Sequence, residues 1–414
     1  MGRGVDRRSF LSAGAVALTG SALGCSAGAD ANEPTALTIR DQFPRADAEV
    51  FLNSAGGVPL GRFAEAGLER YMDFVRLGPG DGRGEYRARM WSEIRGDFAR
   101  LINASAEEIS LVHSTKAGEQ LIMDGLPQLR NGGNIVTNDF HFSGSLHNLV
   151  GMQRAGFDVR IVKSDGRDLP LESMTAAIDD KTALVSVTLL SNVNGRIEPI
   201  RALSDAVHDA GGHLYADIIQ AAGIYPIDVE EMGIDFAACS AYKWLCGVHG
   251  TGFLYVREGL GDSVLDHIRF PGNARHNYPP WNPQPEGGEG DFIVNPPVGG
   301  RRYEPGHVSY LGYSAVYEGL RFIRETGLAA MLHHSATLAR RVCEGLDGDR
   351  YDCTSPNPGD TPIVAFRFDR ALDLEPRLTE NRITISLGSS SMRISPAVFN
   401  TESDVDQLIR VLNS

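Results

Sequence analysis

The sequence predicts an α/β protein with a mostly parallel sheet flanked by helices in a large domain, followed by a smaller C-terminal α+β domain. Its 414 residues exceed the size at which a single hydrophobic core usually stops growing. Up to about residue 260, short β-rich runs alternate with helix-like segments of about 10 to 15 residues, which is typical of parallel sheets. After about residue 300, two long helical segments precede short strands, as in α+β domains.

Residues 1–30 have the order of an export signal. Arg7–Leu11 begins with two arginines, Ser12–Leu23 is mostly apolar, and Gly24–Ala29 consists of small residues. This order resembles a twin-arginine signal. We therefore expect export by the twin-arginine machinery to the periplasm or another extracytoplasmic compartment. The alternative is a buried N-terminal helix that happens to follow an arginine pair.

Two processing patterns overlap at the end of this signal. Ala27–Ala29 suits cleavage by signal peptidase, whereas Ala22–Cys25 is an imperfect lipobox that would make Cys25 a lipid-modified N-terminus. Both alternatives stay open. The remaining cysteines show no CxxC pair and no zinc-ligand spacing, so the sequence predicts neither a disulfide scaffold nor a metal site. We expect most of these cysteines to be buried thiols. These are Cys239, Cys246, Cys343 and Cys353.

An N-terminal arm is expected over residues 31–65. It is polar up to about Ala46 and then contains Val50–Leu52, a short strand that runs into the turn around Gly56 and Gly57. The large domain is expected over residues 66–300. Its clearest strand candidates are Ile135–Thr137, Val159–Val162, Ala183–Thr188 and His213–Ala216.

The stretch Phe270–Arg302 is rich in proline and glycine, which disfavours regular structure, so we expect an active-site loop and linker there. The small domain is expected over residues 301–414. Its predicted helices are Tyr310–Thr326, Leu328–Leu346 and a final helix from Ser403. Its predicted strands are Pro362–Phe368, Ile383–Ser386 and Ser391–Ser395.

Composition narrows the classes of function. Hydrophobic residues make up 42% of the chain and charged residues 22%, which is ordinary for a folded globular protein. The net charge of -14 disfavours a broad basic face that would neutralise nucleic-acid phosphates. We therefore expect no nucleic-acid partner, and no internal segment is long enough to span a bilayer.

Lys243 is the first candidate for a catalytic residue. It follows the β-rich run Asp235–Ser240 and precedes Trp244. A lysine amine at a strand end, shielded by aromatic neighbours and close to a cation, has a lowered pKa and reacts readily with an aldehyde. The alternative is a surface lysine in a turn.

Asp217 ends the apolar run His213–Ala216, and Gln220 follows where the pattern predicts the first turn of a helix. The carboxylate can pair with the nitrogen of an electron-accepting ring, and Gln220 can bind a phenolic oxygen. The alternative role of Asp217 is an ordinary helix N-cap.

Ser114 and Thr115 precede the helix-like run Lys116–Leu126. Their hydroxyls and the helix N-terminal amides would form an anion site suited to a phosphate, with simple capping as the alternative. Ser240 and Tyr242 can donate to the same phosphate. A reactive lysine, a ring-pairing acid and a phosphate site together predict pyridoxal phosphate (PLP) as the cofactor, with Lys243 as its Schiff-base lysine.

The order of these motifs resembles the class V aminotransferase superfamily of PLP fold type I, which includes cysteine desulfurases, kynureninase and isopenicillin N epimerase-like proteins. The resemblance covers nearly everything from about Phe51 to Leu412. It implies a mostly parallel seven-stranded sheet in the large domain. The motifs are Ser114–Ala117, Ser191–Gly195, Asp217–Gln220, Ser240–Trp244, Gly250–Arg257 and Met392–Pro396.

The resemblance also implies roles for individual residues. Asn192 would lie near the ring oxygen and the substrate carboxylate, and Arg393 would bind that carboxylate with its bidentate guanidinium, unless it is a buried structural arginine. Family members borrow phosphate contacts from a neighbouring subunit, which implicates Thr251 and His307 and implies a homodimer.

Three departures from the family pattern limit the choice of substrate. Where many relatives stack a histidine on the ring, an ungapped count places Phe142, with His141 as the alternative. Phenylalanine can stack but cannot transfer a proton. Tyr242 replaces the more usual histidine before the lysine and keeps a hydrogen-bond donor. In Thr384–Ser391, where cysteine desulfurases carry their nucleophilic cysteine, no thiol is present.

The sequence therefore predicts a PLP-dependent enzyme that acts at the α-carbon of an amino acid. Lys243 would remove or return the α-proton while Asp217 keeps the ring an electron acceptor. An aminotransferase or an isopenicillin N epimerase-like enzyme is favoured because the loop cysteine is missing. The alternatives are a carbon-sulfur lyase or cysteine desulfurase-like enzyme and, from another class, a non-catalytic PLP-binding module.

Overall fold

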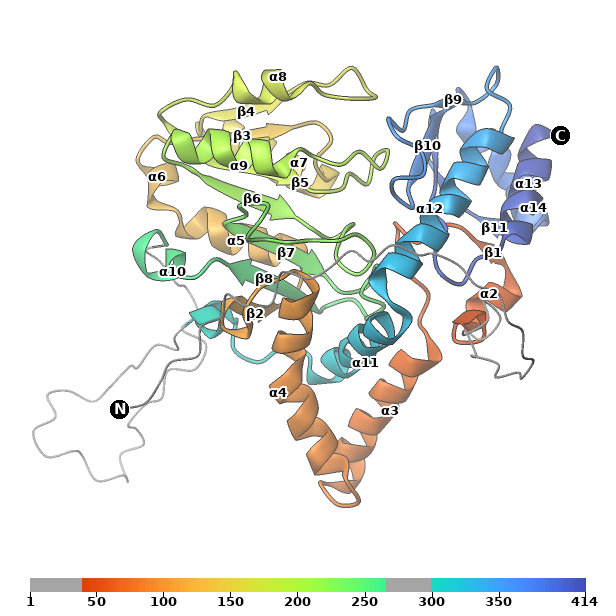
Figure 1. The fold of residues 1–414 in the computed structure, drawn as a ribbon, viewed down its shortest axis with the longest axis horizontal. Helices are drawn as coiled ribbons and strands as arrows, with labels where there is room; N and C mark the ends of the chain where they lie inside the picture. Colours follow the sequence, from red (N-terminus) through yellow and green to blue (C-terminus); the bar gives the residue numbers. More distant parts are fainter. Residues whose placement is uncertain (1–38, 266–298) are drawn as a thin grey trace, which may run out of the picture. The chain divides into compact units, whose positions relative to one another are not determined.

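The computed structural model describes residues 39–265 and 299–414 (Figure 1). The predicted export signal, Cys25 included, and most of the predicted loop from Phe270 lie outside these residues. The described residues group as one compact unit, and the predicted domain limits within it stay predictions. Among the helices of the described residues, none is long and apolar enough to cross a membrane.

A seven-stranded sheet forms the centre of the fold, in the order β2-β8-β7-β6-β5-β3-β4. Only β8 runs antiparallel to its two neighbours, so the predicted mostly parallel sheet is confirmed. Figure 1 shows the strands in this order, from β4 at the top to β2. The strands are β2 (Ile109–Val112), β3 (Asn134–Asn138), β4 (Val159–Val162), β5 (Thr182–Thr188), β6 (His213–Asp217), β7 (Phe236–Ser240) and β8 (Gly252–Val256).

Both faces of this sheet are covered because its strands are apolar on both sides. In β6, for example, Leu214 and Ala216 join one hydrophobic core, while Tyr215 between them joins the core on the opposite face. The first core is completed by α4 (Arg83–Leu101), α9 (Ile200–Asp209) and α11 (Tyr310–Thr326). The second is completed mainly by α5 (Thr115–Gly125), α6 (Pro127–Arg130) and α7 (Ser143–Arg154).

The C-terminal part has its own sheet and core. Its four strands lie in the order β12-β13-β10-β9 and are all antiparallel. They pack with α12 (Leu328–Gly345) and α14 (Glu402–Asn413) in a third hydrophobic core. The strands are β9 (Asp352–Cys353), β10 (Val364–Arg367), β12 (Ser386–Leu387) and β13 (Ser391–Ile394).

The predicted strand Ile383–Ser386 is divided between two sheets. Its first part is β11 (Ile383–Thr384), which pairs in parallel with β1 (Val50–Phe51) of the N-terminal arm. Ser386 belongs to β12 and pairs with Arg393. The arm therefore packs against the C-terminal part of the chain, and Val50 and Leu52 lie in that core.

The other elements are short or connect these layers. The long α3 (Arg62–Leu77) packs closely against α11. Gly67 permits this approach, because a Cβ at this position would lie only 2.5 Å from the Ser314 carbonyl oxygen. The remaining helices are α2 (Pro44–Ala48), α8 (Leu171–Thr175), α10 (Leu260–Ser263) and α13 (Glu375–Glu380). The 3-10 helices are η1 (Ala106–Glu108), η2 (Gly299–Tyr303) and η3 (Ala371–Leu374).

Candidate active site

Lys243 lies three residues after β7, at the edge of the sheet where the parallel strands end, and it is only 5% exposed. Burial lowers the pKa of its amine to about 8. The Asp217 carboxylate opposes this shift, and the Arg393 guanidinium adds to it. Within the described chain the amine makes no hydrogen bond, and it lies 5.7 Å from the centre of the Tyr242 ring. The structure thus brings together the lysine, acid and arginine that the sequence singles out.

Asp217 is the last residue of β6 and is 1% exposed. The amide of Ile219 donates to its Oδ1 at 2.9 Å. Turns and no helix follow β6, so the alternative role of Asp217 as a helix N-cap is wrong. Its Oδ2 is buried and has no hydrogen-bond partner among the described residues. Burial raises the pKa of this carboxyl. A buried carboxylate oxygen without a donor is suited to a cationic N–H from a bound molecule.

Gln220 is not on a helix, contrary to the sequence prediction. The chain after β6 forms consecutive turns, because Gly223 takes a left-handed φ of +98° and packs against the Trp244 carbonyl. The Gln220 amide donates to the carbonyl of Ala55 at 3.0 Å and accepts from the Trp244 indole at 2.9 Å. It therefore ties the N-terminal arm to the segment that carries Lys243, and its predicted contact with the ring stays a prediction.

Thr115 and Ser240 form a reciprocal pair at the start of α5. The Thr115 amide donates to Ser240 Oγ at 2.9 Å, and the Ser240 amide donates to Thr115 Oγ1 at 2.8 Å. Ser114 Oγ accepts from the Ala117 amide at 3.1 Å, so Ser114 is an N-cap. The Thr115 and Ser240 hydroxyls also lie 3.2 Å apart, so one of them donates to the other. The remaining hydroxyl of this pair and that of Ser114 still have a proton to donate. Capping and anion binding are thus compatible here.

The sequence also predicts Tyr242, Thr251 and His307 as site residues. The Tyr242 ring stacks on His249, with ring centres 4.0 Å apart. Thr251 is fully buried and donates its hydroxyl to the Val248 carbonyl at 2.6 Å. His307 is exposed and lies 3.3 Å from the Tyr310 hydroxyl. Contacts of Thr251 and His307 with a second subunit stay predictions.

His141 and Phe142 differ sharply in exposure. Phe142 is 38% exposed, whereas His141 is 1% exposed and its Nδ1 accepts from the Phe142 amide at 2.9 Å. The proton of a neutral His141 therefore belongs on Nε2, which lies 3.3 Å from Ser186 Oγ. Phe142 is the more exposed of the two, whereas His141 lowers the pKa of the Asp217 carboxyl through its charge. Both alternatives for the stacking residue therefore stay predictions.

Glu119 is a site residue that the sequence prediction missed. It lies 1% exposed on α5, accepts from Ser145 Oγ at 2.8 Å and is 3.5 Å from His141 Nε2. Burial alone would raise the pKa of this carboxyl, but the hydrogen bond and charge of His141 lower it. Its helical spacing from the apolar Ile122 and Met123 is a signal that could have indicated an inward-facing carboxylate.

Arg393 is half-buried on β13. It donates from Nη1 to the Asn192 carbonyl at 2.8 Å and from Nη2 to Asn53 Oδ1 at 3.3 Å. Its Nε is buried and has no partner in the described part of the chain. Asn192 and Arg393 line a cavity of about 330 Å³ together with the hairpin between β12 and β13. The structural and substrate-binding roles of Arg393 can therefore coexist.

The N-terminal arm contributes Asn53 and Ala55, which the sequence prediction did not assign to the site. Asn53 meets Arg393, and the Ala55 carbonyl meets Gln220. The glycine-rich turn that follows was recognised in the sequence. Only the tertiary fold brings this turn close to Tyr242, whose ring would lie 3.5 Å from a Cβ built on Gly57.

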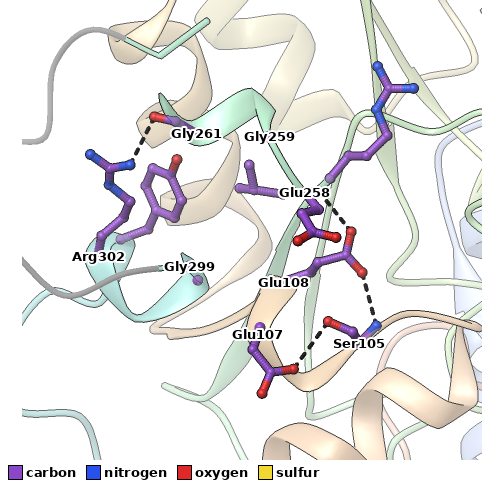
Figure 2. A pocket seen from close by; sticks show the side chains of 12 residues that line it. Ser105, Glu107, Glu108, Glu258, Gly259, Gly261, Gly299 and Arg302 are labelled. Carbon is purple, nitrogen blue, oxygen red and sulfur yellow. Dashed lines mark hydrogen bonds between the residues drawn. The ribbon is translucent and has the colours of Figure 1, made fainter. Parts of the chain in front are cut away.

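A second cavity of about 320 Å³ lies at the opposite edge of the sheet, beside the start of β2 and the end of β8 (Figure 2). Glu108 accepts there from the amides of Ser105 and Glu258, at 2.9 and 2.8 Å. Arg302 donates to the Gly261 carbonyl at 3.2 Å. These contacts cap and connect loops, and none of the predicted site residues lines this cavity.

Comparison with known proteins identifies the family. The aminotransferase class-V family model matches residues 80–410. The uncharacterized aminotransferase YcbU of Bacillus subtilis is 24% identical over 89% of this chain and 95% of its own length. The cysteine desulfurase IscS of Anaeromyxobacter sp. is 34% identical over 77% of this chain and 79% of its own.

Solved structures show the same fold. The cysteine desulfurase CsdA of Escherichia coli has a TM-score of 0.79 and 21% identity, covering 92% of this chain and 98% of its own. The cystine C-S lyase C-DES has a TM-score of 0.77 and 18% identity, covering 90% and 99%. These similarities confirm the predicted PLP fold type I.

The residues present fit PLP. Asp217 offers a buried carboxylate oxygen without a donor, as a protonated ring nitrogen requires. Lys243 offers an amine whose pKa is lowered to about 8, and the hydroxyls of Ser114, Thr115 and Ser240 meet at a helix N-terminus, as a phosphate requires. With the family match over residues 80–410, the chain is a PLP-dependent enzyme that belongs to the aminotransferase class-V family.

Proposed function

We propose that the protein acts at the α-carbon of an amino acid, either transferring its amino group or inverting its configuration. The observation that carries this proposal is Lys243. Its buried amine has a pKa of about 8 and interacts with Asp217 and Arg393. A base with a pKa near neutrality, close to a cation that can bind a carboxylate, is suited to moving an α-proton.

The proposed roles follow from the contacts of each side chain. Ser114, Thr115 and Ser240 would hold the phosphate of PLP, and Asp217 Oδ2 its ring nitrogen. When bound, PLP accepts the electron pair that is left when a bond at the α-carbon breaks. The Lys243 amine would take the α-proton and return it. Arg393 would bind the substrate carboxylate through its unpaired Nε, and it lies beside the cavity near Asn192.

The hairpin beside Arg393 favours transfer or inversion over desulfuration. Gly388–Ser390 joins β12 to β13 as a tight turn, with the Gly388 amide 2.8 Å from the Ser391 carbonyl oxygen. The hairpin contains serines and no thiol, so it has no nucleophile to accept sulfur. A carbon-sulfur lyase, which needs no such cysteine, is the second candidate, and the fold shared with the cystine C-S lyase C-DES supports it.

Product analysis separates these reactions. The holoenzyme is incubated with mixed L- and D-amino acids and a keto acid, and the products are identified by mass spectrometry and chiral chromatography. A new amino acid made from the keto acid indicates transfer, and an inverted amino acid indicates epimerisation. Pyruvate with released sulfide or persulfide would favour the lyase. If no amino acid is altered, both candidates fail.

Arg393→Lys is expected to raise KM about 10- to 100-fold with a smaller change in kcat, because lysine keeps the charge but loses the planar set of donors. Steady-state kinetics on the best substrate measures this split. Arg410→Lys, on the exposed end of α14, is the matched control. A variant with a lowered melting temperature but an unchanged KM would show that Arg393 is only structural.

Cofactor capture is expected to depend on pH through Lys243. The neutral amine is the form that reacts with an aldehyde, and burial lowers its pKa to about 8. The rate at which the apo-protein captures PLP should therefore rise with pH up to about 8 and level off above it. Stopped-flow absorbance measures this rate. A rate that keeps rising tenfold per pH unit to pH 10 would indicate an ordinary lysine pKa.

We also propose export and dimerisation. The arginine pair and apolar run within residues 1–30 support export by the twin-arginine route, which carries folded proteins and so suits a protein loaded with its cofactor beforehand. Cell fractionation of wild type and of Arg7→Lys/Arg8→Lys tests this, because the double variant should stay in the cytoplasm.

Lipid attachment at Cys25 would appear as a mass increase of the mature N-terminus. The proposed homodimer is tested by sedimentation, which measures the oligomeric state.

A further inference from the structure

Two sulfur atoms that are distant from Lys243 lie against each other in the C-terminal part. Cys343, in the last turn of α12, donates to the sulfur of Cys353, on β9, with the two Sγ atoms 3.1 Å apart. This is closer than the 3.5–4.0 Å at which non-bonded carbon atoms usually meet. Both thiols are half-buried at the edge of the C-terminal core, so a small oxidant can reach them. We propose that Cys343 and Cys353 form a disulfide that ties the end of α12 to β9.

The surroundings of the pair favour oxidation starting at Cys353. The hydrogen bond from Cys343 lowers the pKa of the Cys353 thiol, and the positive charge of Arg167 lowers it further. Arg167 also donates to the Cys353 carbonyl and forms an ion pair with Asp352, which holds β9 in place. Thiolate character is what makes a cysteine reactive toward a disulfide oxidant.

The reaction needs a disulfide oxidant such as glutathione disulfide. The Cys353 thiolate attacks one sulfur of the oxidant, its S–S bond breaks, and one glutathione thiolate leaves. Cys343 then gives up its proton and attacks the Cys353 sulfur of the mixed disulfide, which releases the second glutathione. The two protein thiols lose two electrons and two protons, and the oxidant gains them as two thiols.

The bond would fix a wall of the cavity that holds Arg393. Cys353 pairs with Phe366 on β10, and the preceding residue of β10, Ala365, pairs with Arg393 on β13. Thr354, which follows Cys353, lines the same cavity. Tying β9 to α12 therefore restrains the sheet that carries Arg393. This inference does not depend on the reaction proposed above.

Peptide mapping of the full-length holoenzyme tests the proposal. The protein is incubated with glutathione disulfide, denatured without reductant, alkylated and digested with trypsin. The expected product links Val342–Arg350 to Tyr351–Arg367, with a mass about 2 Da below the sum of the two peptides, and it disappears after dithiothreitol treatment. Cys239 and Cys246 are buried internal controls that should be alkylated in every sample. Cys343→Ser should abolish the linked product and leave glutathione on Cys353.

Thermal unfolding provides a second measurement. The oxidised protein should melt about 3 °C above the reduced protein, since the bond closes a short loop in the unfolded chain. This difference should vanish in Cys343→Ser. The proposal is wrong if Cys343 and Cys353 of the oxidised wild type are both alkylated, if each carries glutathione separately, or if either is linked to another cysteine.

Discussion

Lys243→Ala is expected to abolish the absorbance of the bound cofactor at about 410 to 430 nm and to lower kcat by at least about 10⁴-fold. The variant loses both the group that holds the cofactor and the proposed base, and general acid-base catalysis alone contributes up to about 10⁴. Cofactor absorbance, PLP content after dialysis and turnover of the best substrate measure the loss.

The control follows from the small number of lysines in the chain. Besides Lys243 there are only Lys116, Lys163 and Lys181. Lys181→Ala, at an exposed position before β5, should keep the absorbance and the activity. Borohydride reduction and peptide mapping of the wild type should place the cofactor mass on Lys243. If the absorbance persists in Lys243→Ala, one of the other three lysines holds the cofactor and the assignment is wrong.

Asp217→Asn is expected to lower kcat about 10²- to 10³-fold, as for other groups that stabilise charge in a transition state. Asparagine can still accept the hydrogen bond from the Ile219 amide, which now goes to Oδ1 at 2.9 Å. It lacks the negative charge that would pair with the ring nitrogen at the buried Oδ2. Single-turnover kinetics with the preferred amino acid measures this loss.

Asp217→Ala is the matched comparison, because it removes the charge and the hydrogen bond together. It should lose as much activity as Asp217→Asn and, in addition, about 1 to 3 kcal/mol of unfolding free energy, because the buried Ile219 amide loses its acceptor. Denaturant titration of both variants separates the two effects. If Asp217→Asn retains wild-type turnover while Asp217→Ala loses only stability, Asp217 only stabilises the turn after β6.

Local pattern was sufficient where the chemistry lies next to a regular element. Asp217 ends β6, Ser114 directly precedes α5, and α11 spans Tyr310–Thr326, all as the sequence predicts. Strand alternation, capping preference and helical spacing depend only on neighbouring residues. Family motifs in a consistent order then sufficed to predict the fold and the cofactor.

Local pattern failed where a distant segment decides the conformation. Gln220 lies in turns and binds Ala55 and Trp244, because Gly223 must turn back against the Lys243 segment. Glu119 looks like a surface residue of a helix, yet it is buried beside His141. The helical spacing of Glu119 from Ile122 and Met123 could indicate that it faces inward, but its contact with His141 and the turns at Gln220 depend on segments distant in the chain.

The sequence by itself determined that this is a PLP-dependent α/β enzyme, and it singled out Lys243, Asp217 and Arg393. Only the tertiary structure decided that Asn53 meets Arg393, that Phe142 is more exposed than His141, and that two cysteines ten residues apart lie in contact. The physical reason is the distance along the chain over which each kind of interaction acts. Periodicity and capping act within a few residues, whereas a contact between segments exists only after the sheet has ordered and brought the ends of its strands together.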